Sequence, residues 1–371
     1  MVDILTVSGG GVDLLKIACV QTRASDLHDF EATASMILRK IDEAAGMSCE
    51  LMVFPECVYP SYYVGSDEDL FLHSMKRLVS LKQEIAERAR EHRVYIAAGM
   101  MDNSFGRTFN KGVLWGPDGE VVGEVAKSNL WHFDRKYASP GKEYPVFDTS
   151  FGKTGLIVCA DGRAPEICRI LSLKGARVII DMANLVTTGK DLSRVTNPQI
   201  DYMLPSRARE NGIWLVLADK VGLEAGTILN SGGSCIINPK GEVLARASAD
   251  MEEILTCEID AFSEKEYPEL PSREPWRYSI LAEPTEKLPV TENMLYSSSS
   301  RASEVFASVV DFSFSDRESY MDQASFFMDI LEDQDADLIC LPTCPDEWEG
   351  KDLLSTAAES LGNEGTLVFT G

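Results

Sequence analysis

The sequence predicts an α/β fold in which two mixed sheets pack face to face, with helices on the outside. Two observations lead to this prediction. Short apolar runs with strand character alternate with amphipathic helical stretches from residue 15 to about residue 260. Other strand pairs are joined directly by turn sequences, Gly116-Pro117-Asp118-Gly119 and Asn238-Pro239-Lys240-Gly241. Alternation mixed with hairpins indicates layered sheets that contain both parallel and antiparallel strands.

The first half of the chain reads as a β-α-β unit followed by a helix, a strand and a hairpin. Residues 1–14 contain Gly9-Gly10-Gly11 and are expected to be a flexible leader. Residues 15–21 are the first predicted strand, and 51–54 are the second. The helix between them has an apolar stripe at Ala34, Ile37, Ile41 and Ala44. A second striped helix carries Leu78, Leu81, Ile85 and Ala89, before a strand at 94–100 and a hairpin over 112–125.

The second half continues the alternation. The predicted elements, in order, are strands within 146–158, a helix at 164–173, a strand at 178–181, a helix at 198–210, a strand at 214–218, a hairpin over 236–243 and a strand at 253–259. These stretches complete one domain, which we place at 15–261.

The composition argues against several classes of partner and site. The 371 residues include 35 Lys and Arg against 59 Asp and Glu, a net charge of −24. This charge repels phosphate backbones and no basic run offsets it, so we expect no nucleic-acid partner. No apolar run approaches the ~20 residues of a membrane helix, so no membrane partner is expected. The nine cysteines fit neither a secretory framework nor a Cys-x-x-Cys metal site, and no signal-peptide pattern is present, which predicts a cytoplasmic protein without a metal.

Cys159 lies where a strand-like run, 155–158, gives way to a helical pattern. At such a turn, the free amides that open the helix can lower a thiol pKa and bind a developing oxyanion. A single buried cysteine is more often a core residue. However, Glu56 and Lys127 also close predicted strands. Side chains at strand ends can converge on one rim of a sheet, where a carboxylate takes the thiol proton and an ammonium stabilises the oxyanion.

Three motifs resemble, in order and spacing, the signatures of the nitrilase superfamily of carbon–nitrogen hydrolases. They are Phe54-Pro55-Glu56, Lys127 with Leu130, and the run from Cys159 to Glu166; similar stretches follow at 173–176, 207–212 and 233–243. The resemblance implies a four-layer α-β-β-α sandwich and a homo-oligomer. It also implies acyl transfer through a Cys159 thioester, with Glu56 as base, Lys127 and the Ala160 backbone amide at the oxyanion, and no cofactor.

The sequence offers two candidates for a second carboxylate in the site. Members of the resembled family usually carry a glutamate seven residues after the lysine, where this chain has Asp134. Asp134 keeps the charge but is one methylene shorter, so the orientation of substrate or of Lys127 would differ. Glu143 is the rival, and an ordinary loop carboxylate at Asp134 is the third alternative.

The substrate predicted by the resemblance is a small carboxamide or an N-carbamoyl compound (a ureide). Cys159-Ala160-Asp161 is similar to amidase and carbamoylase members, whereas members that act on nitriles usually have Trp-Glu after the nucleophile. Tyr62 and Asn184 are candidate pocket residues. Arg163 is a candidate for binding a substrate carboxylate, although arginine is common at this place in the family and a structural role is favoured. The alternatives are a nitrile hydrolase and a catalytically silent relative that acts in assembly.

The C-terminal part differs in composition. Residues 262–300 contain five prolines and are expected to form an extended arm or linker. Residues 301–371 contain 3 basic and 16 acidic residues. They are predicted to be a degenerate partial repeat, because 338–344 lines up with 51–57 and 307–312 with 17–21. Thr343 stands in the position of Glu56, so no second active site is expected.

Overall fold

The structure is a computed structural model. It describes residues 14–65, 67–104, 106–187, 197–226, 228–262 and 273–291, and the backbone of 307–309, 338–341 and 367–370. The chain divides into two compact units, Met1–Arg273 and Glu274–Gly371. Apart from Leu14, the expected leader lies outside the described residues. No helix in these ranges is long and apolar enough to cross a membrane.

The first unit contains fourteen strands among the described residues. They are β1 (Leu15–Arg23), β2 (Leu51–Val53), β3 (Tyr95–Ser104), β4 (Arg107–Trp115), β5 (Val121–Ala126), β6 (Val146–Thr149), β7 (Gly152–Val158), β8 (Val178–Met182), β9 (Trp214–Ala218), β10 (Lys220–Glu224), β11 (Ile228–Ser231), β12 (Cys235–Ile237), β13 (Val243–Arg246) and β14 (Glu253–Ile259). The α-helices are α1 (Phe30–Gly46), α2 (Glu68–His92), α3 (Asp134–Tyr137), α4 (Pro165–Leu173) and α5 (Leu204–Asn211), and short helices of other types are η1 (Leu27–Asp29), η2 (Cys159–Arg163) and η3 (Gln199–Met203).

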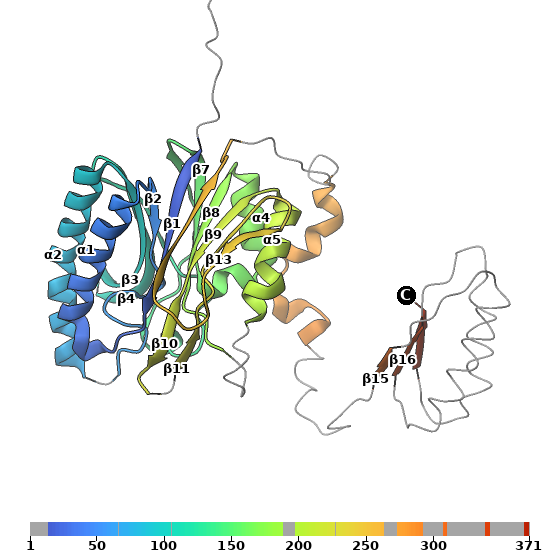
Figure 1. The fold of residues 1–371 in the computed structure, drawn as a ribbon. Helices are drawn as coiled ribbons and strands as arrows, with labels where there is room; N and C mark the ends of the chain where they lie inside the picture. Colours follow the sequence, from blue (N-terminus) through green and yellow to red (C-terminus); the bar gives the residue numbers. More distant parts are fainter. Residues whose placement is uncertain are drawn as a thin grey trace, which may run out of the picture. The chain divides into compact units, whose positions relative to one another are not determined.

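These elements form four layers (Figure 1). Helices α1 and α2 cover an eight-stranded sheet of order β11-β10-β1-β2-β3-β4-β5, in which β14 also pairs with β1. A six-stranded sheet of order β13-β12-β9-β8-β7-β6 lies behind it, and α4 and α5 cover its outer face. The predicted sandwich of two sheets between helices is confirmed.

Both sheets are mixed, as predicted. Strands β1, β2 and β3 pair in parallel through the helical crossovers, whereas β3, β4 and β5 are joined by hairpins and pair antiparallel. In the second sheet β7, β8 and β9 are parallel, and β12 and β13 form a hairpin. The two predicted turns close with hydrogen bonds from Gly119 N to Gly116 O and from Gly241 N to Asn238 O, both 2.9 Å.

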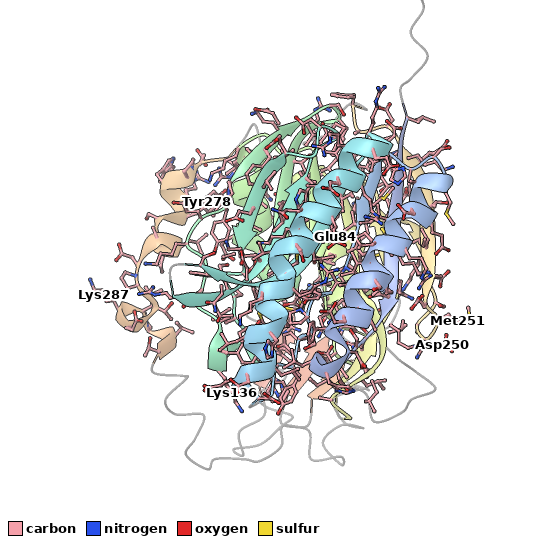
Figure 2. All side chains as sticks on the ribbon, turned by 90° about the vertical axis from the view of Figure 1, so that its left-hand side faces the viewer. Glu84, Lys136, Asp250, Met251, Tyr278 and Lys287 are labelled. Atoms are coloured by element: carbon pink, nitrogen blue, oxygen red, sulfur yellow. The ribbon has the colours of Figure 1, made fainter. Side chains whose placement is uncertain are left out.

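The central strands are buried on both faces. On β1, Ile17 and Cys19 join the core between the two sheets, while Ala18 and Val20 join the core under α1 and α2. Side chains alternate between the faces of a strand, so a strand covered on both sides reads as a continuous apolar run. Figure 2 shows α1 and α2 side by side over this sheet, with Glu84 labelled on α2.

The sequence predicts an extended arm or linker over residues 262–300. Its described part contains two 3₁₀ helices, η4 (Pro275–Ala282) and η5 (Thr285–Lys287). Pro275 occupies the first position of η4, where its missing N–H would have no helical partner in any case.

Three further strands, β15 (Ala307–Val309), β16 (Leu338–Leu341) and β17 (Leu367–Thr370), form a parallel sheet of order β15-β16-β17. Leu338 lies opposite Ala307 and Leu367. In the first unit Leu51 lies opposite Ile17 and Tyr95. The three strands therefore have the order, direction and register of β1, β2 and β3.

Candidate active site

Three strands deliver the predicted catalytic residues to one site. Lys127 directly follows β5, Cys159 directly follows β7, and Glu56 comes three residues after β2. The Glu56 backbone is fixed by contacts with both sheets: its N–H donates to Ala183 O at 3.1 Å, and β3 passes directly beneath it. A Cβ on Gly99 would lie 2.5 Å from the Glu56 Cα, so only glycine permits this close approach.

Lys127 is fully buried and carries two ion pairs. Its Nζ lies 2.7 Å from Glu56 Oε1 and 2.6 Å from Asp134 Oδ2. Burial alone would lower the lysine pKa, but the negative charges of the nearby Glu56 and Asp134 carboxylates raise the pKa of Lys127 well above its ordinary value. Lys127 is therefore an ammonium at any physiological pH.

Asp134 opens α3 and is completely buried. One oxygen contacts Lys127 and the other accepts a hydrogen bond from Trp131 N. Burial raises the Asp134 pKa, against the opposing effect of Lys127. Glu143, the rival carboxylate, instead lines an open pocket of about 540 Å³ with Arg107, Lys111 and Glu124.

The two carboxylate oxygens of Glu56 differ in their hydrogen-bond partners. Oε1 accepts hydrogen bonds from Asn110 Nδ2 at 2.6 Å and from Lys127 Nζ. Oε2 is buried and has no hydrogen-bond partner among the described residues. A buried, unpartnered carboxylate oxygen is costly, and it is the atom of this side chain that remains available to accept a proton.

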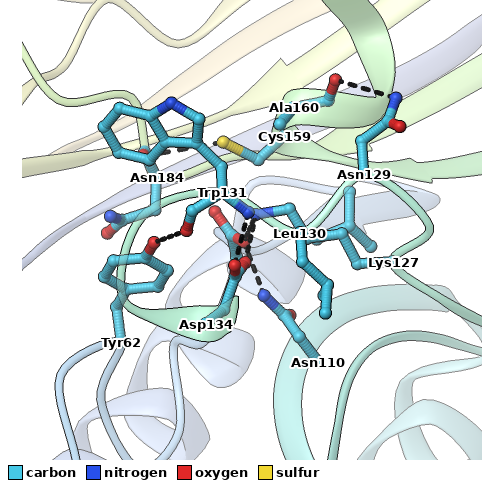
Figure 3. Close-up of polar contacts among 12 residues, drawn as sticks. Tyr62, Asn110, Lys127, Asn129, Leu130, Trp131, Asp134, Cys159, Ala160 and Asn184 are labelled. Atoms are coloured by element: carbon cyan, nitrogen blue, oxygen red, sulfur yellow. Dashed lines mark hydrogen bonds and ion pairs between the residues drawn. The ribbon is translucent and has the colours of Figure 1, made fainter. Parts of the chain in front are cut away.

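Cys159 stands on a strained elbow. Its φ of 51° is in the left-handed region, which L-residues rarely adopt outside functional turns. Two side chains hold its peptide groups: the Cys159 N–H donates to Asp181 Oδ1 at 2.8 Å, and Gln199 Nε2 donates to the Cys159 carbonyl at 2.6 Å. The thiol itself lies 3.6 Å from the Asn184 carbonyl oxygen (Figure 3).

The expectation that the elbow lowers the Cys159 pKa is wrong for the resting site. Burial raises the pKa of this thiol well above its ordinary value, and the Glu56 charge adds to the increase, while Lys127 opposes it. A thiol whose pKa is raised needs a base before it can act as a nucleophile. The elbow amide that remains for an oxyanion is that of the buried Ala160, in the first turn of η2.

Aromatic and amide side chains surround the thiol (Figure 3). Tyr62 is buried, donates from its hydroxyl to Trp131 O at 2.7 Å, and has its ring centre 5.9 Å from Lys127 Nζ. The Asn184 side chain is buried, and neither its oxygen nor its nitrogen has a partner in the described ranges. Both Asn184 atoms are thus free to bind a polar group.

Arg163 is placed differently from these residues. Its Nε donates to Gln199 Oε1 at 3.0 Å, and its guanidinium stacks over the Trp131 ring at 5.0 Å. The carbonyl of Arg163 accepts from Arg207 at 3.1 Å. These contacts tie Arg163 to the scaffold around the elbow.

Sequence reasoning missed four side chains that shape the site: Asn110, Trp131, Asp181 and Gln199. Asp181 ends a strand that the sequence does predict, but nothing in the pattern marks its carboxylate. Within the described ranges, no cluster of three or more His, Cys, Asp or Glu is arranged to hold a metal ion.

The sequence is similar to those of known hydrolases. The sequence profile of the family described as carbon–nitrogen hydrolase matches residues 16–269. A nitrilase from Pyrococcus abyssi is 33% identical over 254 residues, which cover 67% of this chain and 91% of that protein. An omega-amidase from Homo sapiens is 26% identical over 256 residues, covering 66% and 88%.

The fold is also similar to solved structures. A double mutant of the amidase from Nesterenkonia sp. AN1, solved in complex with acrylamide, superposes with a TM-score of 0.63 at 21% identity, covering 74% of this chain and 99% of that chain. The same amidase has been solved in complex with butyramide, with a TM-score of 0.61 at 22% identity over 72% of this chain and 96% of that one.

Proposed function

This chain belongs to the carbon–nitrogen hydrolase family, within the nitrilase superfamily, and from that premise we propose that it hydrolyses small carboxamide or N-carbamoyl substrates through a thioester on Cys159. Membership makes it a hydrolase of carbon–nitrogen bonds. The proposal adds the substrate class and the catalytic set Glu56, Lys127 and Cys159.

The observation that carries the proposal is the asymmetry of Glu56. One oxygen is tied to Lys127 and Asn110, and the other, buried, has no partner among the described residues. A carboxylate held by one oxygen keeps the other for proton transfer, which is what a general base beside a protonated thiol requires.

The first half-reaction forms the thioester. Glu56 takes the proton of the Cys159 thiol, and the thiolate attacks the amide carbon. The carbonyl oxygen becomes an oxyanion, which accepts hydrogen bonds from Lys127 Nζ and the Ala160 N–H. The C–N bond then breaks, and the leaving nitrogen takes the proton from Glu56 and departs as ammonia or an amine.

The second half-reaction releases the acid. Glu56 removes a proton from water, the hydroxide attacks the thioester carbon, and the same two donors hold the oxyanion. The C–S bond breaks, the sulfur recovers its proton from Glu56, and the free enzyme is released with a carboxylic acid, or with a carbamic acid when the substrate is an N-carbamoyl compound. In this scheme Asp134 orients Lys127, while Tyr62 and Asn184 bind the substrate.

Relatives support an amide substrate. Both the human omega-amidase and the Nesterenkonia enzyme are named amidases. The name of the Pyrococcus relative, nitrilase, favours nitriles as the second candidate. Arg163 is a weak candidate for binding a substrate carboxylate, because Gln199 and Trp131 already engage it.

The test is ammonia release from a matched panel. Butyramide, an N-carbamoyl amine and butyronitrile would be compared with wild type and with Cys159→Ala. We expect ammonia from at least one of the first two with wild type and none with Cys159→Ala. Release from butyronitrile alone would move the assignment to nitriles, and no release from any of the three would favour a catalytically silent member.

The remaining proposals concern the cell and the assembly. We propose a cytoplasmic enzyme; the cysteines at 19, 49, 57, 159, 168, 235 and 257 are all free thiols, in line with a reducing compartment. We propose a homo-oligomer, which is the assembly that the family resemblance implies. We also propose that 301–371 are a partial repeat, which the register of β15, β16 and β17 supports.

A further inference from the structure

Strand β10 begins where the chain crosses from one sheet to the other. Strand β9 belongs to the six-stranded sheet and β10 to the eight-stranded sheet, and Asp219 is the one residue between them. Lys220 and Glu224, at the two ends of β10, are almost completely buried. Residues four apart on a strand share a face, and Lys220 Nζ lies 3.1 Å from Glu224 Oε2. This ion pair takes no part in the proposed chemistry.

The second oxygen of Glu224 reaches the wall of the active site. Oε1 accepts hydrogen bonds from the backbone N–H groups of Tyr62 at 2.6 Å and Tyr63 at 2.7 Å. Tyr62 is in turn held by its hydroxyl, which donates to Trp131 O, and by its carbonyl, which accepts from Tyr137. The segment that presents the Tyr62 ring beside Lys127 therefore depends on one carboxylate that is 162 residues away in sequence.

We propose that Glu224, paired with Lys220, is a positioning residue of the active site: it fixes Tyr62 so that the ring closes the pocket around the substrate amide. This inference rests on the proposed function, since it concerns how the amide group is held. Glu224 touches no reacting atom and acts through the backbone of Tyr62.

The chemistry of the pair supports this role. Two main-chain N–H groups in a buried site need an acceptor, and one carboxylate oxygen can satisfy both. A carboxylate buried this deeply needs a countercharge, which Lys220 supplies. The Glu224 carboxylate is therefore the functional part of the pair, and Lys220 stabilises its charge in the buried site.

Two double variants isolate the acceptor. Lys220→Met/Glu224→Gln removes both charges but keeps an oxygen for the two N–H groups. Lys220→Met/Glu224→Leu removes both charges and the oxygen. Neither variant leaves an unpaired buried charge, so they differ mainly in whether the Tyr62 backbone is held.

The readout is alkylation of Cys159 by acrylamide, an amide whose double bond accepts a thiolate and so reports pocket binding without turnover. The rate would be followed by mass spectrometry against acrylamide concentration. We expect the Leu double variant to have a half-saturation concentration about tenfold above that of the Gln double variant, the effect of roughly one strong hydrogen bond. The maximal rate should differ by less than about twofold, because the nucleophile is untouched.

Adding Tyr62→Ala to both double variants tests whether Glu224 acts through Tyr62. With Tyr62→Ala added, the difference between the two double variants should disappear, because the residue being positioned no longer has a ring. Asp102→Asn is the matched control: it disturbs another buried carboxylate, paired with Lys82 and Lys111, and should lower the melting temperature without changing half-saturation.

Equal half-saturation in the two double variants would overturn the inference, as would a difference that persists with Tyr62→Ala. If the Leu double variant does not fold, Glu224→Gln alone carries the test. In this variant the side-chain amide oxygen at position 224 would pair with Lys220, and the NH₂ group would face the Tyr62 N–H, which would lose its acceptor. A half-saturation concentration of acrylamide equal to that of wild type would therefore also overturn the inference. Failure of the proposed function is separate: wild type would release no ammonia, while acrylamide alkylation would still report Tyr62 positioning.

Discussion

The main-chain N–H of Cys159 donates a 2.8 Å hydrogen bond to the carboxylate of Asp181, across the paired ends of β7 and β8. Because this hydrogen bond already uses the Cys159 N–H, the proposed mechanism assigns the oxyanion to Lys127 and the Ala160 N–H. The hydrogen bond also holds Cys159 in a left-handed conformation that costs an L-residue roughly 1–2 kcal/mol.

The first prediction follows from this bond. Asp181→Asn keeps an oxygen for the Cys159 N–H and should retain most activity. Asp181→Ala leaves a buried N–H without a partner, which costs about 1–3 kcal/mol and releases the elbow, so kcat should fall about tenfold to a hundredfold with little change in KM. Steady-state kinetics on the amide that wild type hydrolyses best gives the answer; equal losses in both variants would contradict it.

Asp134 should act through its charge. Asp134→Asn replaces a charge-assisted bond to Lys127, worth about 1.5–3 kcal/mol, and should lower kcat by roughly one to two orders of magnitude. Asp134→Glu keeps the charge and should retain measurable activity. Glu143→Gln, in the open pocket, is the control and should behave like wild type. Full activity of Asp134→Asn would make this carboxylate a bystander.

The raised pKa of Asp219 predicts that the stability of the fold depends on pH. Burial raises its pKa to about 8. Between the unfolded value near 4 and this folded value, the native state keeps a proton that the unfolded state has lost, so stability falls as pH rises, by up to about 1.4 kcal/mol per pH unit. Asp219→Asn, which mimics the neutral carboxyl, should flatten this slope between pH 5.5 and 7.5.

Urea unfolding at these two pH values measures the slope. Asp102 is the control: burial alone would raise its pKa, but Lys82 and Lys111 lower it, so it titrates below the measured window and Asp102→Asn should leave the slope unchanged. A wild-type slope that Asp219→Asn does not reduce would assign the effect to another group.

Glu56 should have opposite effects on turnover and on alkylation. Glu56→Gln removes the general base and should reduce hydrolysis by roughly 10² to 10⁴. It also removes a negative charge that raises the Cys159 pKa, so iodoacetamide should alkylate this thiol faster than in wild type at pH 9. Peptide mapping identifies the labelled cysteine. Slower labelling would contradict the prediction, because it would show that losing Glu56 as a base outweighs the lowered pKa of the thiol.

Residues after 298 should contribute no chemistry. The residues of the described site lie between Glu56 and Glu224, and Thr343 replaces Glu56 in the proposed repeat. A chain that ends at Ser298 should therefore keep wild-type kcat per folded site, although its oligomer size can change. Active-site titration with iodoacetamide supplies the count of folded sites, and a truncated chain that alkylates normally but does not turn over would contradict the prediction.

Much of the fold could be predicted from the sequence because strands buried on both faces give unbroken apolar runs. Among the described strands of the first unit, the exceptions were β10 and β11. Strand β10 begins and ends with the charged residues Lys220 and Glu224, and Gly222 lies between them with a φ of 85°. Local pattern reads such a segment as a polar loop, because the ion pair that makes burial possible forms only in the folded structure.

The candidate site likewise contains residues that the sequence predicts and residues that it does not. Glu56, Lys127 and Cys159 each close an apolar strand, which a sequence shows directly. Asn110 and Gln199 act on residues 54 and 40 positions away, and their amides carry no local signal. The resting state of Cys159 was also out of reach, since its raised pKa comes from burial that only the assembled sheets produce.

The pairing of β1 with β14 has a consequence for synthesis. Leu15 lies opposite Ile259 and Gln21 opposite Glu253. The pairing of β1 with β14 therefore cannot form until β14, the last strand of the domain, has been synthesised. At ~5–20 residues per second, translation takes roughly ten to fifty seconds to cover this interval. Throughout this interval the edge of β1 that β14 will occupy stays unpaired, and an unpaired strand edge is a template on which another chain can pair.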